Sequence, residues 1–334
     1  MDVERDIGWG IVGPGRIAAK VVEDFVHVPG ARAVAVASRS MDRAQAFASE
    51  HNLERAYGSY AEIMADADVD ALYVATPHPQ HRAVAVRALE AGKAVLVEKT
   101  FTATVAGAED IVNTAQAHGA FAMEAMWTRF QPAIVSAREL VADGAIGEVR
   151  QVQADLGVDQ PFDPDHRLFD LAQGGGALLD LGVYVVSFAQ YWLGDPYRVT
   201  ATGSVGPTGV DLEAGLLLSY DDGRAAAVLT SLRHYTPGAA RIHGTGGWIE
   251  VRPRFHHPST IIVGRTGHDP ETIVQPPLGT GYAHELIEVT ERVRSGHTES
   301  AIMPLDDTLA VQRLLNQACE TLGVFHTEDA TVEV

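Results

Sequence analysis

The first 126 residues alternate short apolar runs with segments of helical periodicity. The apolar runs cover 7–12, 31–38, 71–76, 94–99 and 120–126, and each of the first four is followed by a helical pattern. Continuous apolar strands joined by crossover helices are typical of a parallel sheet that is covered on both faces. The sequence therefore predicts an α/β domain with a doubly wound parallel sheet.

The pattern changes after residue 126. A helical pattern over 131–144 leads to an alternating strand over 148–158 and to the helix start QGGGALLDLGVYVVSFAQYWLG. Alternating strands separated by turns fill 197–266, and two helices follow over roughly 281–296 and 306–323. Such strands predict a mainly antiparallel sheet with one open face, in a second, α+β domain.

Composition excludes some classes of function. The 334 residues carry a formal net charge of −19, which disfavours binding to nucleic acid or to an anionic membrane because both require a basic surface. The only cysteine, Cys319, lies in a helical pattern, so we expect a buried thiol, no intrachain disulfide and a reducing compartment. The first residues, MDVERDIGWGIVG, lack the basic segment followed by an apolar segment that is typical of an export signal. This favours a cytoplasmic protein.

A glycine turn follows the first predicted strand. The segment GPGRIA places Gly13 and Gly15 before a helix that begins with Arg16 and Ile17. Glycines at these positions allow a tight turn and let the backbone approach a pyrophosphate, which then rests on the helix N-terminus. The motif alone is weak, but a strand before it and a helix after it favour dinucleotide binding.

The end of the second strand indicates which dinucleotide is bound. NAD-binding domains place an acidic residue there for the ribose hydroxyls. This chain has Ser38, Arg39, Ser40 and Arg43 instead, and arginine offers forked donors to a phosphate. The sequence therefore predicts NADP as the cofactor, with NAD as the second possibility.

Polar residues follow the third and fourth strands, at the edge where ligands of doubly wound sheets bind. We expect these residues to line the nicotinamide end of the site: Thr76, Pro77, His78, His81, Glu98 and Lys99. The two histidines have no carboxylate or cysteine partner at a ligand spacing, so we expect no metal.

In the second domain, GGGALLDLGVY places Asp180 and Tyr184 four residues apart, which puts both on one face if the segment is an α-helix. The glycines leave room for a ligand at the helix start. The alternative is a flexible loop before an ordinary helix, with Tyr184 in the core.

Five segments in order, GPGRIA, ATPHPQH, AGKAVLVEK, MEAMWTRF and GGGALLDLGVY, resemble those of the glucose–fructose oxidoreductase / inositol dehydrogenase (Gfo/Idh/MocA) family. Within it, the chain is most similar to the NADP-dependent dihydrodiol and D-xylose dehydrogenases, over nearly its whole length. The resemblance implies a Rossmann domain over 1–126 and, over 127–334, a substrate-binding and oligomerisation domain with an open-faced sheet.

The resemblance also implies roles for particular residues. Lys99 corresponds to the family's catalytic lysine, Asp180 and Tyr184 to its second motif, and Trp127 and Arg129 to a W-x-R segment near nicotinamide and substrate. One departure is visible, because Thr100 stands where the family usually has a proline. That exchange affects the turn that aims the lysine.

These residues suggest a proton transfer. A tyrosine is a weak base near neutral pH, and a neighbouring ammonium group makes its deprotonated form more favourable. The chain has three lysines against 22 arginines, so a lysine at this strand end is notable. We expect Tyr184 to take a proton from a sugar or diol hydroxyl, Lys99 to assist it and Asp180 to orient the lysine or the substrate.

The sequence thus predicts an NADP-dependent dehydrogenase of a pyranose or a vicinal diol. Two alternatives remain: an NADPH-dependent reductase of a keto-sugar such as anhydrofructose, and a catalytically silent NADP-sensing regulator. A sensor has no use for Lys99, Asp180 and Tyr184 together, which favours an enzyme. The open sheet face predicts a homodimer or homotetramer.

Overall fold

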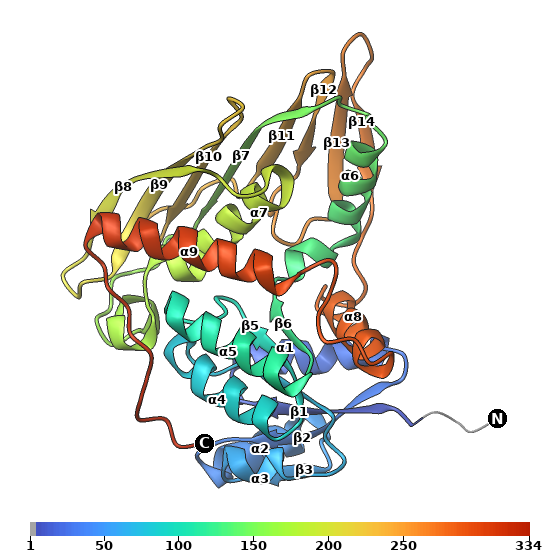
Figure 1. Ribbon diagram of the computed structural model, residues 1–334, viewed down its shortest axis with the longest axis vertical. Coiled ribbons are helices and arrows are strands. Elements are labelled where there is room, and N and C mark those ends of the chain that lie inside the picture. Colours follow the sequence, from blue (N-terminus) through green and yellow to red (C-terminus); the bar gives the residue numbers. More distant parts are fainter. Residues whose placement is uncertain (1–4) are drawn as a thin grey trace. The chain divides into compact units, whose positions relative to one another are not determined.

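The computed structural model describes residues 5–334, and Figure 1 shows the order of their elements. These residues form two compact units. The first unit contains the chain up to Met126 together with Leu278–Thr308 and Glu328–Val334. The second unit contains Trp127–Pro277 and Leu309–Thr327.

The first unit is built on a parallel sheet with the strand order β3-β2-β1-β4-β5-β6. Its strands are β1 Ile7–Val12, β2 Ala31–Ala37, β3 Arg55–Tyr57, β4 Ala71–Val74, β5 Ala94–Glu98 and β6 Ala122–Ala125. The strand order reverses between β1 and β4, and in doubly wound sheets ligands bind beyond the carboxyl ends of the strands at this point. The short strand β3 was not predicted from the sequence.

Helices connect these strands, and the periodicity predicts all of them except the short helix over Tyr60–Met64. They are α1 Arg16–Asp24, α2 Met41–His51, α3 Tyr60–Met64, α4 His78–Glu90 and α5 Val105–His118, with the single turn η1 Phe25–His27 after α1. The strands β4 and β5 are buried along their whole length, which explains why they read as continuous apolar runs.

Helix α8 (Ala283–Arg294) belongs to the first unit, although the sequence pattern assigned all of 127–334 to the second domain. The carboxylate of Asp24, at the end of α1, accepts hydrogen bonds from the backbone N–H groups of Thr280, Tyr282 and Ala283 at 2.8, 2.8 and 3.0 Å. This cap joins residues that are far apart in sequence, so no local sequence pattern predicts it.

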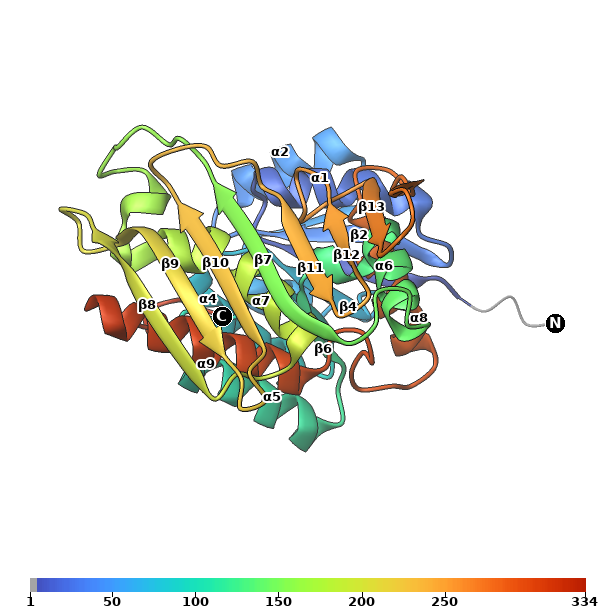
Figure 2. The ribbon, with the colours of Figure 1, turned by 90° about the horizontal axis from the view of Figure 1, so that it is seen from above.

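The second unit is built on a larger sheet with the strand order β14-β13-β12-β11-β7-β10-β9-β8 (Figure 2). Its strands are β7 Val149–Gly157, β8 Arg198–Val205, β9 Asp211–Ser219, β10 Ala225–Ser231, β11 Ala240–Gly244, β12 Gly247–Val251, β13 Thr260–Arg265 and β14 Glu271–Val274. Neighbouring strands are antiparallel except β7 and β10, which run parallel. The prediction of a mainly antiparallel sheet is confirmed.

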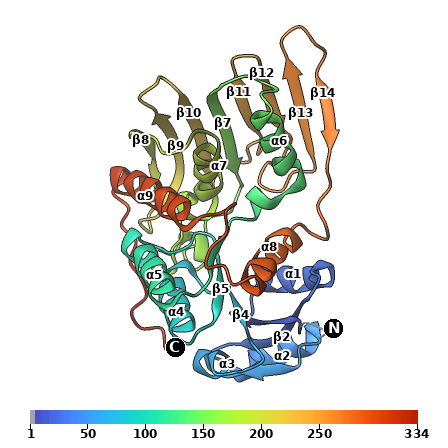
Figure 3. The same ribbon diagram turned by 45° about the vertical axis from the view of Figure 1, so that its right-hand side comes forward.

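One face of this sheet packs against helices. Helix α7 (Val183–Leu193) lies on β7 and β10, and α6 (Pro132–Ala142) lies on β12 and β13 (Figure 3). The remaining segments are η2 Trp127–Phe130, η3 Arg167–Phe169, η4 Leu171–Gln173, the π-helical turn η5 Leu178–Gly182 and α9 Leu305–Leu322, which counts with the second unit from Leu309 on.

Of the described residues, one helical stretch, Leu171–Leu193, is long and apolar enough to cross a membrane by length and composition alone. In the structure, 83% of its apolar window is buried, and α7 within it covers the sheet. This is the environment of a core helix.

Candidate functional site

Gly13 and Gly15 form the turn between β1 and α1. Gly13 has a φ of 92°, and a Cβ atom there would lie 2.9 Å from the carbonyl oxygen of Ala75, so the position requires glycine. A Cβ on Gly15 would meet nothing within 4 Å, so the space before α1 is open. Arg16 and Ile17 form the first turn of α1. An open helix N-terminus of this kind suits a pyrophosphate.

Arg39 and Arg43 lie on the surface just after β2. Arg43 donates a hydrogen bond from Nη2 to the carbonyl of Pro14 at 3.2 Å, which places its guanidinium beside the glycine turn. Ser38 Oγ accepts a hydrogen bond from the N–H of Ser40 at 3.2 Å. The structure therefore brings the predicted phosphate-binding arginines to the same end of the sheet as the glycines.

The chain's final segment also reaches this region. Gln80 Nε2 donates to Asp329 Oδ2 at 3.1 Å. Hydrogen bonds from Thr331 hold the pKa of the Asp329 carboxyl below its usual range, and the charge of Arg39 adds to this effect. Arg39 also interacts with the hydroxyl of Tyr60. An acidic side chain therefore lies within the electrostatic reach of Arg39, which the sequence did not reveal.

The turn after β4 carries Thr76, Pro77 and His78, and α4 begins at His78. Thr76 is 8% exposed, and its Oγ1 has no hydrogen-bond partner among residues 5–334. A buried hydroxyl without a partner is costly, and a bound ligand would relieve the cost. With the glycine cradle, this hydroxyl makes the end of the sheet fit a dinucleotide.

His81 is fully buried and holds this turn in place. Its Nε2 lies 2.7 Å from the carbonyl of Thr76, and its Nδ1 lies 3.0 Å from the carbonyl of Thr100. Burial lowers the pKa of the imidazole to about 4, against the opposing effect of these carbonyls. The ring therefore has no exposed atom for a ligand, and its contribution to a cofactor site is indirect, through the turns it joins. The Lys99–Thr100 peptide bond is cis.

Lys99 follows β5 and is partly exposed, whereas Glu98 before it is 8% exposed. The Tyr73 hydroxyl and the N–H of Lys99 donate to the Glu98 carboxylate. Behind them, Glu285 of α8 is fully buried, and burial together with the charges of Glu98 and Asp24 raises its pKa well above the usual range. The sequence missed Glu285, because α8 reaches this place only through the fold.

In the second unit, Asp180 lies in a π-helical turn before α7. The N–H of Val183 bonds the carbonyl of Leu178, five residues back, so the α-helical spacing assumed for Asp180 and Tyr184 does not hold. Both Nη atoms of Arg167 donate to Asp180 Oδ1 at 3.0 Å. Arg167 begins the short turn η3, in a segment without a recognisable motif, and sequence reasoning missed it.

Tyr184 lies at the start of α7 and is 8% exposed. Its hydroxyl accepts a hydrogen bond from Trp127 Nε1 at 3.2 Å, and its ring lies 5.0 Å from the ring of His256. The Thr128 hydroxyl donates to the carbonyl of His256 at 2.8 Å. Trp127, Tyr184 and His256 therefore form one contact group, called the tyrosine group, and His256 is the member that the sequence did not predict.

Arg129, which the sequence predicts as a cofactor contact, is held by residues of α7. It is 2% exposed, donates from Nη2 to Gln190 Oε1 at 2.8 Å and stacks over the Tyr191 ring at 4.6 Å. Its planar guanidinium thus fixes the W-x-R segment to α7.

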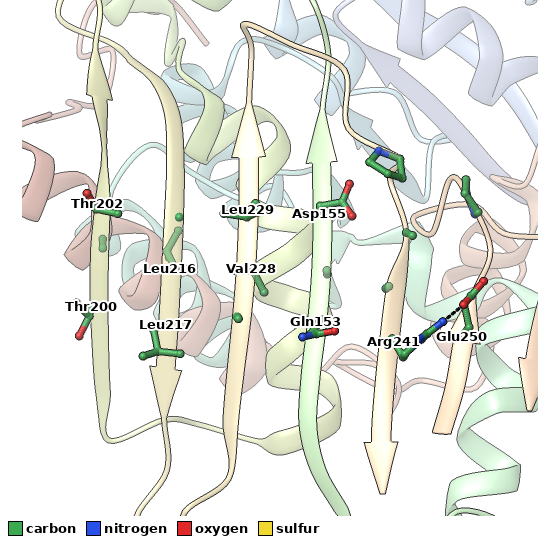
Figure 4. A pocket seen from close by; sticks show the side chains of 18 of the residues that line it. Gln153, Asp155, Thr200, Thr202, Leu216, Leu217, Val228, Leu229, Arg241 and Glu250 are labelled. Carbon is green, nitrogen blue, oxygen red and sulfur yellow. Dashed lines mark hydrogen bonds and ion pairs between the residues drawn. The ribbon is translucent and has the colours of Figure 1, made fainter. Parts of the chain in front are cut away.

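A hollow of about 720 Å³ lies elsewhere in this unit, on the sheet (Figure 4). Its lining includes Gln153, Thr200, Leu217 and Leu229, and Arg241 pairs with Glu250 beside it. Asp180, Tyr184 and Trp127 are not part of its lining, so it is a feature of the sheet surface and separate from the tyrosine group.

Two family descriptions match the chain. "Oxidoreductase family, NAD-binding Rossmann fold" covers residues 7–126, and "GFO/IDH/MocA C-terminal domain" covers residues 134–250. Trans-1,2-dihydrobenzene-1,2-diol dehydrogenase of Mus musculus is 35% identical over 96% of this chain and 98% of its own length. The chain belongs to the GFO/IDH/MocA oxidoreductase family.

Other known proteins are similar to the chain over nearly its whole length. The dihydrodiol dehydrogenase of Xenopus tropicalis is 36% identical, over 95% of this chain and 98% of that protein. Aldose-aldose oxidoreductase from Caulobacter crescentus superposes with a TM-score of 0.85 at 27% identity, over 96% of this chain and 98% of that one. KijD10, a 3-ketoreductase from Actinomadura kijaniata in complex with NADP and TDP-benzene, gives 0.82 at 27% identity, over 95% and 98%.

The predicted family and fold class are thereby confirmed, and the protein is an NAD(P)-dependent oxidoreductase. Its residues support this assignment, because the glycine turn and the buried Thr76 hydroxyl suit the dinucleotide that the family binds.

Proposed function

We propose that the protein is an NADP-dependent dehydrogenase that oxidises a hydroxyl of a vicinal diol or of a pyranose sugar. The observation that carries the proposal is the Tyr184 hydroxyl, which accepts the Trp127 indole hydrogen bond in a chain with an NAD(P)-binding domain. The printed activities of the relatives support the substrate class, since they act on trans-dihydrodiols and aldoses.

Tyr184 is the proposed base. The indole N–H of Trp127 donates to the tyrosine oxygen and stabilises negative charge on it, and in this proposal the same oxygen takes the proton of a substrate hydroxyl. Arg167 donates two hydrogen bonds to Oδ1 of Asp180. These bonds fix the orientation of the whole Asp180 carboxylate. Asp180 then orients the substrate or the lysine.

Lys99 supplies the positive charge in this proposal. A flexible ammonium group serves a tyrosine and a substrate hydroxyl at once, which the rigid fork of arginine does less well. When bound, NADP accepts the hydride that leaves the substrate carbon. Glu98 is fixed by Tyr73 and by the Lys99 backbone, and this restrains the segment that carries the ammonium group.

The cofactor preference also belongs to the proposal. Arg39 and Arg43 are exposed after β2, where an NAD-binding domain carries an acidic residue, and Arg43 already bonds the glycine turn. Two guanidinium groups at this position favour a cofactor with a 2′-phosphate. NADP is therefore the proposed physiological cofactor, and NAD a poorer one.

We further propose that the protein is a cytoplasmic homodimer or homotetramer and that it binds neither nucleic acid nor membranes. The large side chains of Leu217 and Leu229 are 47% and 57% exposed on the sheet, beside the hollow of Figure 4. A second copy of the same sheet face would cover them, because paired identical patches are the commonest oligomer contact.

A second direction of reaction is favoured by one neighbour, since KijD10 is a 3-ketoreductase. The test therefore runs both ways. A panel of aldoses, polyols and trans-diols is assayed for NADP reduction, and the matching keto-sugars for NADPH oxidation. We expect turnover of a diol or a pyranose. Binding of NADP without turnover of any member in either direction would instead support a silent sensor.

A further inference from the structure

Three side chains that offer a metal ligand meet inside the second unit. Asp211 begins β9, Cys319 lies in the last turns of α9, and His326 follows that helix. One ligand atom from each, a carboxylate oxygen, the thiol sulfur and a ring nitrogen, lie within 4.8 Å of one another. None of these residues belongs to the tyrosine group or to the predicted cofactor site.

The cluster leaves polar atoms without partners. Asp211 is fully buried; its Oδ2 accepts a hydrogen bond from the N–H of Leu178 at 2.7 Å, whereas Oδ1 has no partner among residues 5–334. His326 faces the carbonyl of Leu171, and neither ring nitrogen completes a hydrogen bond within the described chain. Orphaned atoms of this kind, buried together, carry a cost that a bound ion would remove.

The backbone beside the cluster is shaped around the carboxylate. Gly176 has a φ of 123°, and a Cβ atom there would lie 2.3 Å from Asp211 Oδ1. Any side chain at this position would therefore collide with the unpartnered oxygen. The glycine-rich segment, which the sequence suggested as room for a substrate, makes room here for a buried carboxylate.

We propose that Asp211, Cys319 and His326 bind one divalent transition-metal ion of the zinc class. A thiolate, an imidazole and a carboxylate are the donors that zinc takes in proteins, and this mixed set does not suit magnesium or calcium. Tetrahedral zinc with bonds of about 2.0–2.3 Å holds its ligands roughly 3.5 Å apart, so each pair of ligand atoms, now within 4.8 Å, closes by about 1.3 Å at most.

The surroundings supply what such a site needs. The Leu171 carbonyl can take the hydrogen of one imidazole nitrogen and so turn the other toward the ion. The Cys319 thiol must lose its proton to bind the ion, and binding releases that proton to solvent. Three protein ligands leave a fourth position for water.

The site has a structural consequence. The second oxygen of Asp211 bonds Leu178 at the start of the π-helical turn that carries Asp180. An ion would therefore link β9, α9 and the segment after α9 to that turn. Bound zinc should raise the melting temperature of the protein, since it binds the folded state and not the unfolded chain.

The test uses tag-free full-length protein, stripped with a chelator and then exposed to zinc or cobalt alone. After desalting, we expect close to one zinc per chain by elemental analysis. Cobalt should give a thiolate charge-transfer band, and the band reports Cys319 because the chain has no other cysteine. Cys319→Ser should abolish the band, and His326→Gln should weaken cobalt binding by more than about tenfold.

His297→Gln is the matched control, since His297 is exposed in the first unit, and it should bind cobalt like the wild type. Asp211→Asn, which keeps the size of the side chain, serves as a second ligand variant, and circular dichroism checks that each variant is folded. Folded wild-type protein that retains no zinc and shows no thiolate band would overturn the proposal. Equal zinc retention by Cys319→Ser and the wild type would do the same.

Discussion

Arg39 is the residue on which the choice of cofactor should depend most. It is exposed after β2, where an acidic residue would favour NAD, and in our proposal it makes a charge-assisted contact to the 2′-phosphate, a group that NAD lacks. Arg39→Ala should therefore raise the KM for NADP by about tenfold or more and leave that for NAD nearly unchanged. Steady-state kinetics with both cofactors measure this.

Arg87→Ala is the matched control, because Arg87 is an exposed arginine of the first unit that pairs with Glu90 on α4. It should change neither KM. Equal use of NAD and NADP by the wild type would contradict the assignment of Arg39.

At the scale of elements, the attachment of α8 depends on one carboxylate. Asp24 is 2% exposed and accepts three backbone N–H groups at the start of this helix. Asp24→Ala should leave these donors unpaired and lower the free energy of unfolding by about 2 kcal/mol. Urea denaturation checks this, with Glu23→Ala on exposed α1 surface as the control. An unchanged midpoint would show that water replaces the cap without loss.

The segment after α9 should respond to pH through Glu328. Its carboxylate accepts hydrogen bonds from the N–H and the hydroxyl of Thr104 at 2.9 and 2.8 Å. Burial nevertheless raises its pKa to about 7. Because the folded state holds this proton more tightly than the unfolded chain, the stabilising effect is complete below about pH 4.5 and is lost as the pH rises through about 7.

Hydrogen exchange of residues 328–334 should accordingly become faster between pH 6 and pH 8, after correction for the intrinsic rate. Glu328→Gln keeps the accepting oxygen and carries no charge, so its corrected exchange should not change over this range. An identical pH response in the variant and the wild type would assign the effect to another group.

The sequence predicted most elements because their patterns are local. The apolar runs at 71–76 and 94–99 correspond to β4 and β5. The tight turn predicted at Gly13 is present, and Gly13 has the positive φ that such a turn requires. Contacts over long sequence distances were not predictable: α8 joins the first unit through Asp24, and Glu285 lies behind Glu98 only because of that return. Helical spacing at Asp180 failed because a π-helical turn intervenes.

For the whole molecule, the sheet face of the second unit is the proposed contact between copies. Leu229 is 57% exposed on β10, and a charge there could not be buried against an identical face without a large desolvation cost. Leu229→Arg should reduce the oligomer to monomers in light scattering at micromolar concentration. Val26→Arg, at a position 83% exposed in the first unit, should leave the mass unchanged. A monomeric wild type would contradict the proposal.

In the proposed mechanism, Tyr184 and Lys99 serve one proton transfer. Tyr184→Phe keeps the ring that lies against His256 and removes the oxygen that Trp127 bonds, so kcat should fall on the order of 10²–10⁴-fold while NADP still binds. Lys99→Met should also lower kcat and move the acidic limb of the pH–rate profile, where the tyrosine loses its proton, to higher pH, because it removes the charge that assists the tyrosine.

The most direct test is the kcat of the double variant compared with the two single variants, on the best substrate of the panel. If the two groups act in one step, the double variant should be little slower than the slower single variant, since effects of groups that act as a unit do not add. Two results would contradict a shared proton transfer. One is a kcat of Tyr184→Phe near that of the wild type. The other is a fold-decrease in kcat of the double variant that equals the product of the two single fold-decreases.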